Sequence, residues 1–150
     1  MNAFTEDNLV QVTMSDYLRD MHGWRAVMAW NQETFGPEGT FGRKSDKDVI
    51  LTRYLSEALV KLNPDLPEVA YKQALREITD IFGSQSLIRI NQDKYNLIRD
   101  GVKVKYRQNG EQKIERLRVF DLDDPVNNDF LCVREMWIRG YAHRRRADII

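Results

Sequence analysis

The 150-residue sequence contains one cysteine, Cys132, and it lacks any apolar run near the ~18 residues of a membrane span. A single cysteine excludes an internal disulfide framework and a zinc site built on Cys-x-x-Cys pairs, and it is typical of a reducing compartment. The first residues, MNAFTEDNLV, do not have the apolar core of a signal peptide. These absences predict a cytoplasmic protein that has no membrane partner.

The sequence also lacks an excess of either charge, because Lys+Arg and Asp+Glu both number 23. Net charge therefore indicates no particular partner. A hydrophobic fraction of 42% and a charged fraction of 31% are ordinary for a globular protein, and the length suits one domain. The charge is unevenly placed, however: residues 139–150 contain four arginines and one aspartate, whereas residues 121–129 contain four aspartates without a lysine or arginine.

Several catalytic and binding motifs are absent. No Gly-x-Ser-x-Gly elbow occurs, and the glycines before Arg43 do not have the spacing of a phosphate-binding loop. The acidic segment after residue 120 fails as a calcium loop, because Cys132 stands where the bidentate glutamate belongs. His22 and His143 lie too far apart in sequence to support zinc hydrolase chemistry.

Hydrophobic periodicity predicts helices in the first hundred residues and strands after them. A first helix is expected over 5–21, and its apolar side comprises Leu9, Val12, Tyr17, Leu18 and Met21. Ser45 and Asp48 resemble a capping pair for a helix that ends at Asn63–Pro64. Two further helices are expected from Pro67 towards Gly83 and over 87–99.

Strands are expected near 26–30 and, after Gly101, over 102–106, 114–120 and 130–138, and Asn109-Gly110 provides a hairpin turn. A last strand begins near Ala147, and the sequence ends inside it. We expect the natural chain to continue, because an unfinished strand edge is rare at the end of a domain. The pattern predicts an α+β fold with a helical region over about 1–100 and a sheet region over about 101–150.

The sequence RRRADII (144–150) is the segment that best suits chemistry. A carboxylate that a sheet holds rigidly, here Asp148, can bind a divalent metal, and Arg144, Arg145 and Arg146 can pair with phosphates. The local pattern alone is more typical of a solvated turn before a strand.

Three stretches together resemble the N-terminal region of the restriction (R, motor) subunit of type I restriction–modification enzymes. The resemblance covers about residues 6–150 and includes the link Leu-Asn-Pro-x-Leu-Pro, the run Asp-x-Asp-x-Pro-x-Asn-Asn-x-Phe from Asp121 to Phe130, and the Arg-x-Asp that enters a strand at Asp148. The sequence departs from the family pattern at Ala147, where a proline is preferred before the aspartate.

The resemblance implies a restriction-endonuclease-like nuclease domain of the PD-(D/E)xK type, with a central mixed sheet flanked by helices. It implies that Asp148 is the catalytic aspartate and holds Mg²⁺, whereas the partner Glu-x-Lys strand lies beyond Ile150. It also makes Glu6, on the first helix, a further metal ligand; the alternative role of Glu6 is helix capping. Asp121–Asp129 would then organise a loop, with Asn127 and Asn128 bonding its backbone.

The expected function is a part of the DNA-cleaving R subunit of a type I restriction enzyme, and it implies double-stranded DNA and the modification and specificity subunits as partners. ATP would be used only by motor domains elsewhere in the full subunit. We expect residues 1–150 alone not to cut DNA, because Glu-x-Lys is absent. Two alternatives stay open: a non-catalytic subunit-docking module, and a plain DNA-binding domain that uses Arg144–Arg146.

Overall fold

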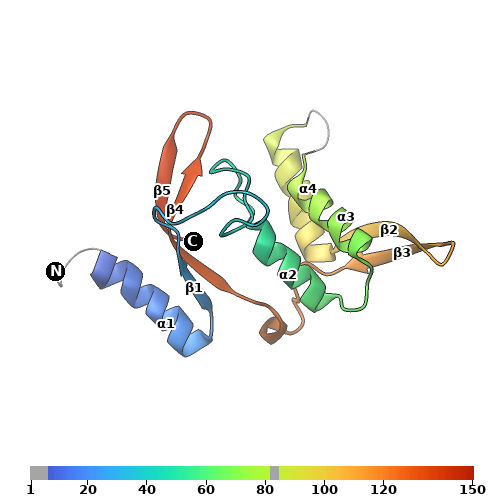
Figure 1. Cartoon of the computed structure of the whole chain (residues 1–150), viewed down its shortest axis with the longest axis horizontal. Coiled ribbons are helices and arrows are strands. Elements are labelled where there is room, and N and C mark those ends of the chain that lie inside the picture. The colour runs from blue at the N-terminus through green and yellow to red at the C-terminus, as the bar shows by residue number, and fades with distance from the viewer. Residues whose placement is uncertain (1–6, 82–84) are drawn as a thin grey trace. The chain divides into compact units, whose positions relative to one another are not determined.

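The computed structural model describes residues 7–81 and 85–150 (Figure 1), and they form an α+β fold as the sequence predicts. The chain divides into two compact units, residues 1–51 with 129–150 and residues 52–128. The elements in chain order are η1 (Asp7–Val12, π-helical), α1 (Thr13–His22), β1 (Arg25–Met28), α2 (Thr52–Leu62), α3 (Glu68–Thr79), α4 (Leu87–Asp100), β2 (Val102–Gln108), β3 (Glu111–Leu117), η2 (Pro125–Asn127, 3-10), β4 (Leu131–Arg139) and β5 (Arg144–Ile149).

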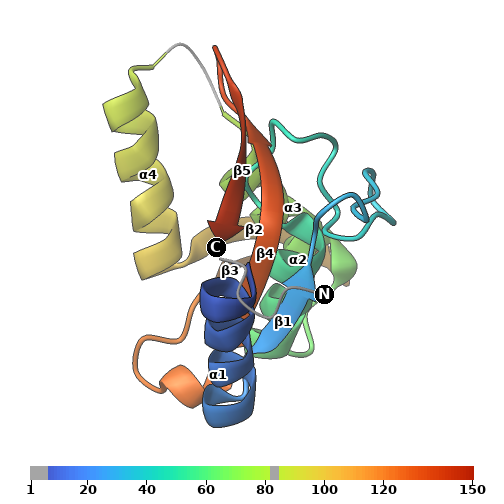
Figure 2. The same ribbon diagram turned by 90° about the vertical axis from the view of Figure 1, so that its left-hand side faces the viewer.

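The first unit contains a mixed three-stranded sheet in the order β1-β4-β5. β1 runs parallel to β4, with Arg25 opposite Leu131, and β5 returns antiparallel to β4, with Arg139 opposite Arg144. Helix α1 packs beside β1 and β4 (Figure 2). Trp24 and Phe130, which precede the two parallel strands, stack with ring centroids 5.1 Å apart. The parallel pairing of β1 with β4 therefore joins segments that lie more than a hundred residues apart in the sequence.

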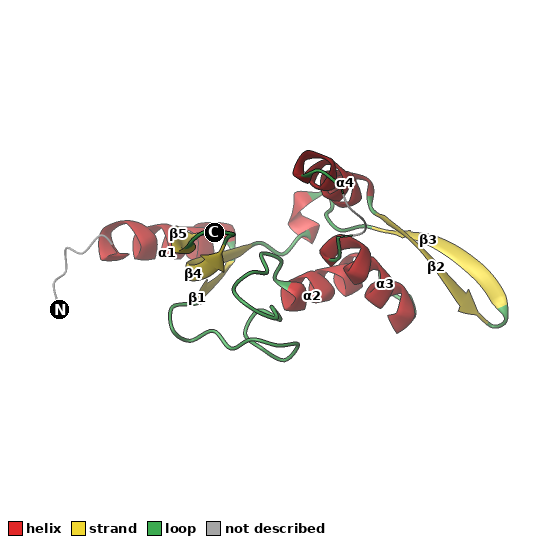
Figure 3. Ribbon diagram, turned by 90° about the horizontal axis from the view of Figure 1, so that it is seen from above, coloured by secondary structure: helices red, strands yellow, loops and turns green. Residues whose placement is uncertain are grey.

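The second unit contains α2, α3 and α4 with the β2–β3 hairpin, whose turn end extends beyond α3 (Figure 3). Helix α3 packs on β2, and small side chains allow the close approach. The buried residues of these two elements are Ala70, Ala74, Ile78, Val102, Val104 and Tyr106. At the end of α3 the Lys94 ammonium donates to the Glu77 carbonyl at 2.6 Å and also to the Asp80 carbonyl, where a cation is favourable.

The predicted helix cap at Ser45 and Asp48 and the predicted start of the last strand are wrong. Residues 45–48 form a turn and not a helix cap: the Asp48 carboxylate accepts from the backbone N–H of Lys44 at 2.8 Å, and α2 begins only at Thr52. Such local bonds compete with helix formation. The last strand begins at Arg144 instead of near Ala147, because all three arginines pair with β4.

The apolar side predicted for the first helix is also wrong in part. Leu9, Tyr17 and Met21 are exposed, and Gln11 and Ser15 are the buried residues. The segment before Thr13 is π-helical, with bonds from i to i+5, so the 3.6-residue period does not hold across it. Thr5, the first residue of the expected helix, lies outside the described residues.

Candidate functional site

Asp148 lies in β5, which pairs with β4 along one edge. Because side chains alternate along a strand, Asp148 shares a face of the sheet with Arg144 and Arg146, and Arg145 lies on the opposite face. Asp148 is exposed. In the part of the chain that the structure describes, its carboxylate makes no hydrogen bond or ion pair with another residue. A rigidly held, solvent-exposed carboxylate is thus available at this face.

The two arginines on the face of Asp148 are held by acidic side chains. Arg144 Nε lies 2.7 Å from an Asp46 carboxylate oxygen, and its guanidinium lies 4.3 Å from the centre of the Trp137 ring. Arg146 Nε contacts the Glu135 carboxylate. All of these residues except Asp46 lie on β4 and β5, the two strands labelled in Figure 1. The arginine run predicted to bind DNA therefore has internal partners at two of its three positions.

Arg145 differs from its neighbours. Its side chain is exposed on the opposite face of β5, and we find no ion pair or hydrogen bond of its guanidinium with residues 7–81 or 85–150. Of the three arginines predicted to contact DNA, Arg145 is the one whose guanidinium N–H groups are all open to solvent among the described residues.

Asp46 is a site residue that the sequence did not single out. Its carboxylate also lies 3.1 Å from Arg139 Nε, and its backbone carbonyl accepts from the Arg139 N–H at 2.7 Å. Burial raises the pKa of the Asp46 carboxyl, but the hydrogen bond and charge of Arg139 with the charge of Arg144 outweigh it and hold the pKa below its ordinary value. Asp46 is therefore an anion that joins its loop to the turn end of the β4–β5 hairpin.

Arg43, in the same loop, is fully buried. Its Nε donates to Glu33 at 2.7 Å, Nη1 donates to the Asp48 carbonyl at 2.8 Å, and Nη2 donates to the Trp137 carbonyl at 3.0 Å. The loop that the sequence suggested as a failed phosphate-binding motif is thus built around a buried ion pair.

Glu135 is the second residue that sequence reasoning missed. Its side chain is 7% exposed inside the central strand β4, and its φ of 59° lies in the left-handed region. A charged residue between the apolar Cys132-Val133 and Met136 is the signal that could have drawn attention to it. The strand pairs on either side, Arg134 with Ile149 and Met136 with Ala147, put Glu135 opposite Asp148 in the ladder.

The donor set suits magnesium only in part. Among the described residues no group of three or more His, Cys, Asp or Glu side chains is positioned to hold a metal ion. Mg²⁺ nevertheless requires only one or two protein carboxylates when water and phosphate oxygens complete its shell, and Asp148 fits that requirement. Glu6, the further ligand implied by the resemblance, lies outside the described residues.

The acidic loop lies in the second unit as far as Asn128 and is held by internal hydrogen bonds; Asn128 bonds its backbone as predicted, whereas Asn127 bonds the Asp121 side chain. Asn128 accepts from the Asp121 N–H at 2.8 Å and donates to the Asp121 carbonyl at 2.8 Å. The Asn127 amide and the backbone N–H groups of Asp124 and Asp123 donate to the Asp121 carboxylate. These bonds, with the charge of Arg118, lower the pKa of that carboxyl against the opposing effect of burial.

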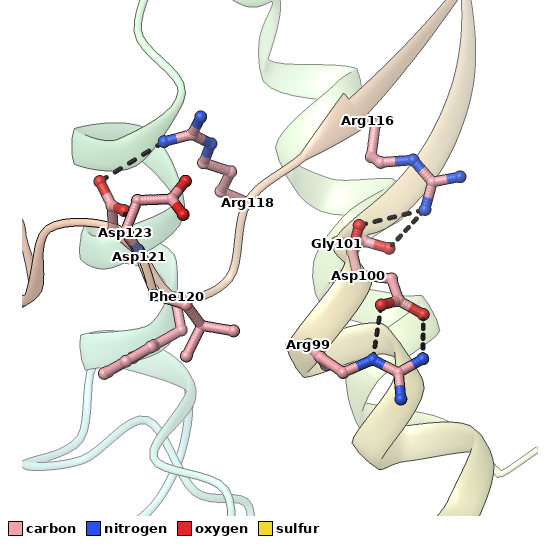
Figure 4. A pocket seen from close by; sticks show the side chains of 9 residues that line it. Arg99, Asp100, Gly101, Arg116, Arg118, Phe120, Asp121 and Asp123 are labelled. Carbon is pink, nitrogen blue, oxygen red and sulfur yellow. Dashed lines mark hydrogen bonds and ion pairs between the residues drawn. The ribbon is translucent and has the colours of Figure 1, made fainter.

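A cavity of about 280 Å³ in the second unit has three arginines at its rim (Figure 4). Arg99 Nε and Nη2 each donate to an oxygen of the Asp100 carboxylate at 2.6 Å. Arg116 donates to the Asp100 carbonyl at 3.1 Å, and Arg118 Nη1 lies 3.4 Å from the Asp121 carboxylate. Because each guanidinium already has a partner, an anion entering the cavity would compete with existing bonds. The cavity does not form a second candidate site.

No helix in residues 7–81 or 85–150 is long and apolar enough to cross a membrane. The family model described as the type I restriction enzyme R protein N terminus matches residues 3–150. No solved structure matches the chain significantly.

Two curated relatives are similar over most of this chain. The type I restriction enzyme HindI endonuclease subunit of Haemophilus influenzae is 42% identical over 114 residues, which are 75% of this chain and 11% of that protein. A protein named for the type I restriction enzyme MjaIXP endonuclease subunit, from Methanocaldococcus jannaschii, is 26% identical over 111 residues, 72% of this chain and 11% of its own length. The similarity thus spans about a tenth of each relative.

Proposed function

The chain belongs to the family of type I restriction enzyme R protein N termini, and from that premise we propose that it is part of the module that cleaves DNA, with Asp148 as the catalytic, metal-binding aspartate. The observation that carries the proposal is the Asp148 carboxylate, exposed on β5 and without an internal partner among the described residues. The endonuclease family of the relatives supports it. The reaction is Mg²⁺-dependent hydrolysis of a phosphodiester in unmodified double-stranded DNA.

Each residue has a defined task in this proposal. When bound, Mg²⁺ supplies a water of lowered pKa and stabilises the charge that builds on the phosphate. Asp148 holds the ion at the sheet, because its strand is paired with β4 and its carboxylate is not neutralised by an arginine. Arg145, with its free guanidinium on the other face, is the best placed of Arg144–Arg146 to contact a backbone phosphate. Glu6 remains a proposed further ligand.

A single carboxylate does not make a complete nuclease site. We propose that a Glu-x-Lys pair after Ile150 completes it, the glutamate as a second ligand and the lysine as the group that orients the water or stabilises the transition state. Residues 1–150 alone are then expected to leave DNA intact. Efficient Mg²⁺-dependent nicking of supercoiled plasmid by this polypeptide, abolished by Asp148→Ala, would contradict the requirement for Glu-x-Lys.

The remaining functions of the complete subunit are proposed from the family. ATP-driven translocation would lie in the nine-tenths of the relatives' length outside the similarity, and the modification and specificity subunits would be its partners. We propose action in the cytoplasm, where the substrate DNA is met.

A phage-plating assay tests the function in cells that carry the complete enzyme. Asp148→Asn is expected to abolish restriction of unmodified phage, because the ion loses its carboxylate. Asp20→Asn, at an exposed position on α1, is the matched control and is expected to restrict normally. Normal restriction by Asp148→Asn would contradict the proposal.

A further inference from the structure

Arg146 is the cation nearest in the strand to the proposed metal ligand. Arg146 and Asp148 lie two positions apart on one face of β5, a spacing of roughly 6.6 Å between Cα atoms at 3.3 Å per residue. An arginine side chain reaches that far. If nothing else engaged it, Arg146 would pair with Asp148 and compete with a divalent cation for that carboxylate.

Glu135 engages Arg146 instead. Its Oε2 contacts Arg146 Nε as an ion pair, although without hydrogen-bond geometry, and that oxygen has no other partner in the described part of the chain. A buried carboxylate is strongly unfavourable unless a cation compensates it. Arg146 therefore pairs with Glu135, because a buried carboxylate is destabilised more by the loss of its cation than the solvent-exposed Asp148 carboxylate is.

The backbone of Glu135 is strained at the position from which its carboxylate contacts Arg146. A φ of 59° is unfavourable for a non-glycine residue, and such strain persists only where the surroundings compensate it. Glu135 stands opposite Asp148 in the ladder, yet its carboxylate reaches diagonally to Arg146. The Glu135 side chain is thus directed towards the Arg146 guanidinium.

Two indole rings complete the restraint. The Arg146 guanidinium carbon lies 5.4 Å from the centre of the Trp30 ring and 5.8 Å from that of Trp137, distances at which cation–π attraction is significant. The guanidinium is therefore held by one carboxylate and two rings, all of them in the first unit.

We infer that Glu135 is a positioning residue: by holding Arg146 against the indole rings, it keeps the Asp148 carboxylate available to a divalent cation. The inference rests on the proposed function of Asp148. It assigns Arg146 an internal role, whereas the sequence predicted a DNA contact.

Mn²⁺ is the probe, and the readout is the paramagnetic broadening of the amide NMR signals of residues 147–149 in the whole 150-residue chain. Glu135→Gln preserves size and removes the charge, so it releases Arg146 to pair with Asp148. The Mn²⁺ concentration for half-maximal broadening is then expected to rise about two- to fivefold, the range set by an exposed ion pair. In Glu135→Gln/Arg146→Gln the competing cation is gone, and the wild-type concentration is expected to return.

A matched control uses the other held arginine. Asp46→Asn releases Arg144, which lies four positions from Asp148, roughly 13 Å along the strand, so no change at residues 147–149 is expected. The chemical shifts of the Trp24 and Trp137 indole N–H groups report whether each variant keeps the fold of the first unit.

The outcomes separate the two claims. If Glu135→Gln binds Mn²⁺ like the wild type, the positioning role is wrong. It is also wrong if the double variant does not regain the wild-type Mn²⁺ concentration, because removing Arg146 would not restore a lost metal ligand or repair a packing defect. If Asp148→Asn leaves the broadening at residues 147–149 unchanged, the metal assignment of Asp148 fails, and the inference fails with it.

Discussion

The buried ion pair between Arg43 and Glu33 allows a quantitative prediction for the loop beside the candidate site. The two side chains are 0% and 7% exposed, so Glu33→Gln leaves a guanidinium charge without its anion in the protein interior. Removing one partner of a buried pair destabilises a protein by about 3–5 kcal/mol. For a chain of this length that corresponds to a drop in melting temperature of about 6–20 °C.

A surface pair provides the control. Arg19 and Asp16 lie 2.9 Å apart with side chains 51% and 45% exposed, and Asp16→Asn is expected to change stability by less than about 1 kcal/mol. Both pairs belong to the first unit, so one assay compares them.

Urea unfolding followed by tryptophan fluorescence is that assay, since all three tryptophans, at positions 24, 30 and 137, lie in the first unit. The free energy of unfolding is expected to fall at least three times further for Glu33→Gln than for Asp16→Asn. Equal losses for the two variants would refute the argument that burial makes the Arg43 charge dependent on Glu33.

Three further predictions concern other parts of the chain. Asp121→Asn is expected to destabilise the second unit at pH 7, and the difference from wild type should become smaller on acidification. The reason is that a lowered folded-state pKa gives stability that is present above the unfolded-state pKa and lost as the pH falls through the folded-state pKa; urea unfolding by far-UV circular dichroism at pH 7 and pH 3 measures it. Gly101→Ala should destabilise that unit more than Gly110→Ala in the same assay: both glycines have positive φ, but a Cβ on Gly101 would meet the Leu117 carbonyl oxygen at 2.6 Å, whereas Gly110 has open space. Arg145→Gln should reduce the salt dependence of DNA binding by about one unit of slope, while Arg144→Gln should leave it unchanged, as titrations at several salt concentrations would reveal.

The local parts of the fold were predictable from the sequence. Asn109 and Gly110 both adopt positive φ, and the hairpin they predict is present, although its second strand starts at Glu111 and not at Ile114. The helix expected over 87–99 extends over Leu87–Asp100, and the Ser86 hydroxyl caps it by accepting from the Arg89 N–H. These features depend on residues a few positions apart.

The surroundings of Asp148 were not predictable in the same way. Arg43 meets the Trp137 carbonyl across 94 positions, and Asp46 meets Arg139 across 93. A parallel pairing such as β1 with β4 leaves no local signal of which strand is the partner. The sequence predicted Asp148 and its arginines as site residues, which stays a prediction, whereas Asp46 and Glu135, which engage Arg144 and Arg146, emerged only from the fold.

The central claim is that Asp148 is the metal-binding aspartate of a DNA-cleaving module, and it is tested most directly by measuring cleavage and ATP hydrolysis together. The complete type I enzyme would be assembled with wild-type, Asp148→Asn or Asp20→Asn R subunit and supplied with unmodified plasmid, Mg²⁺ and ATP. The account predicts that Asp148→Asn hydrolyses ATP at the wild-type rate but leaves the plasmid uncut, while Asp20→Asn does both. Cleavage by Asp148→Asn at the wild-type rate would contradict it.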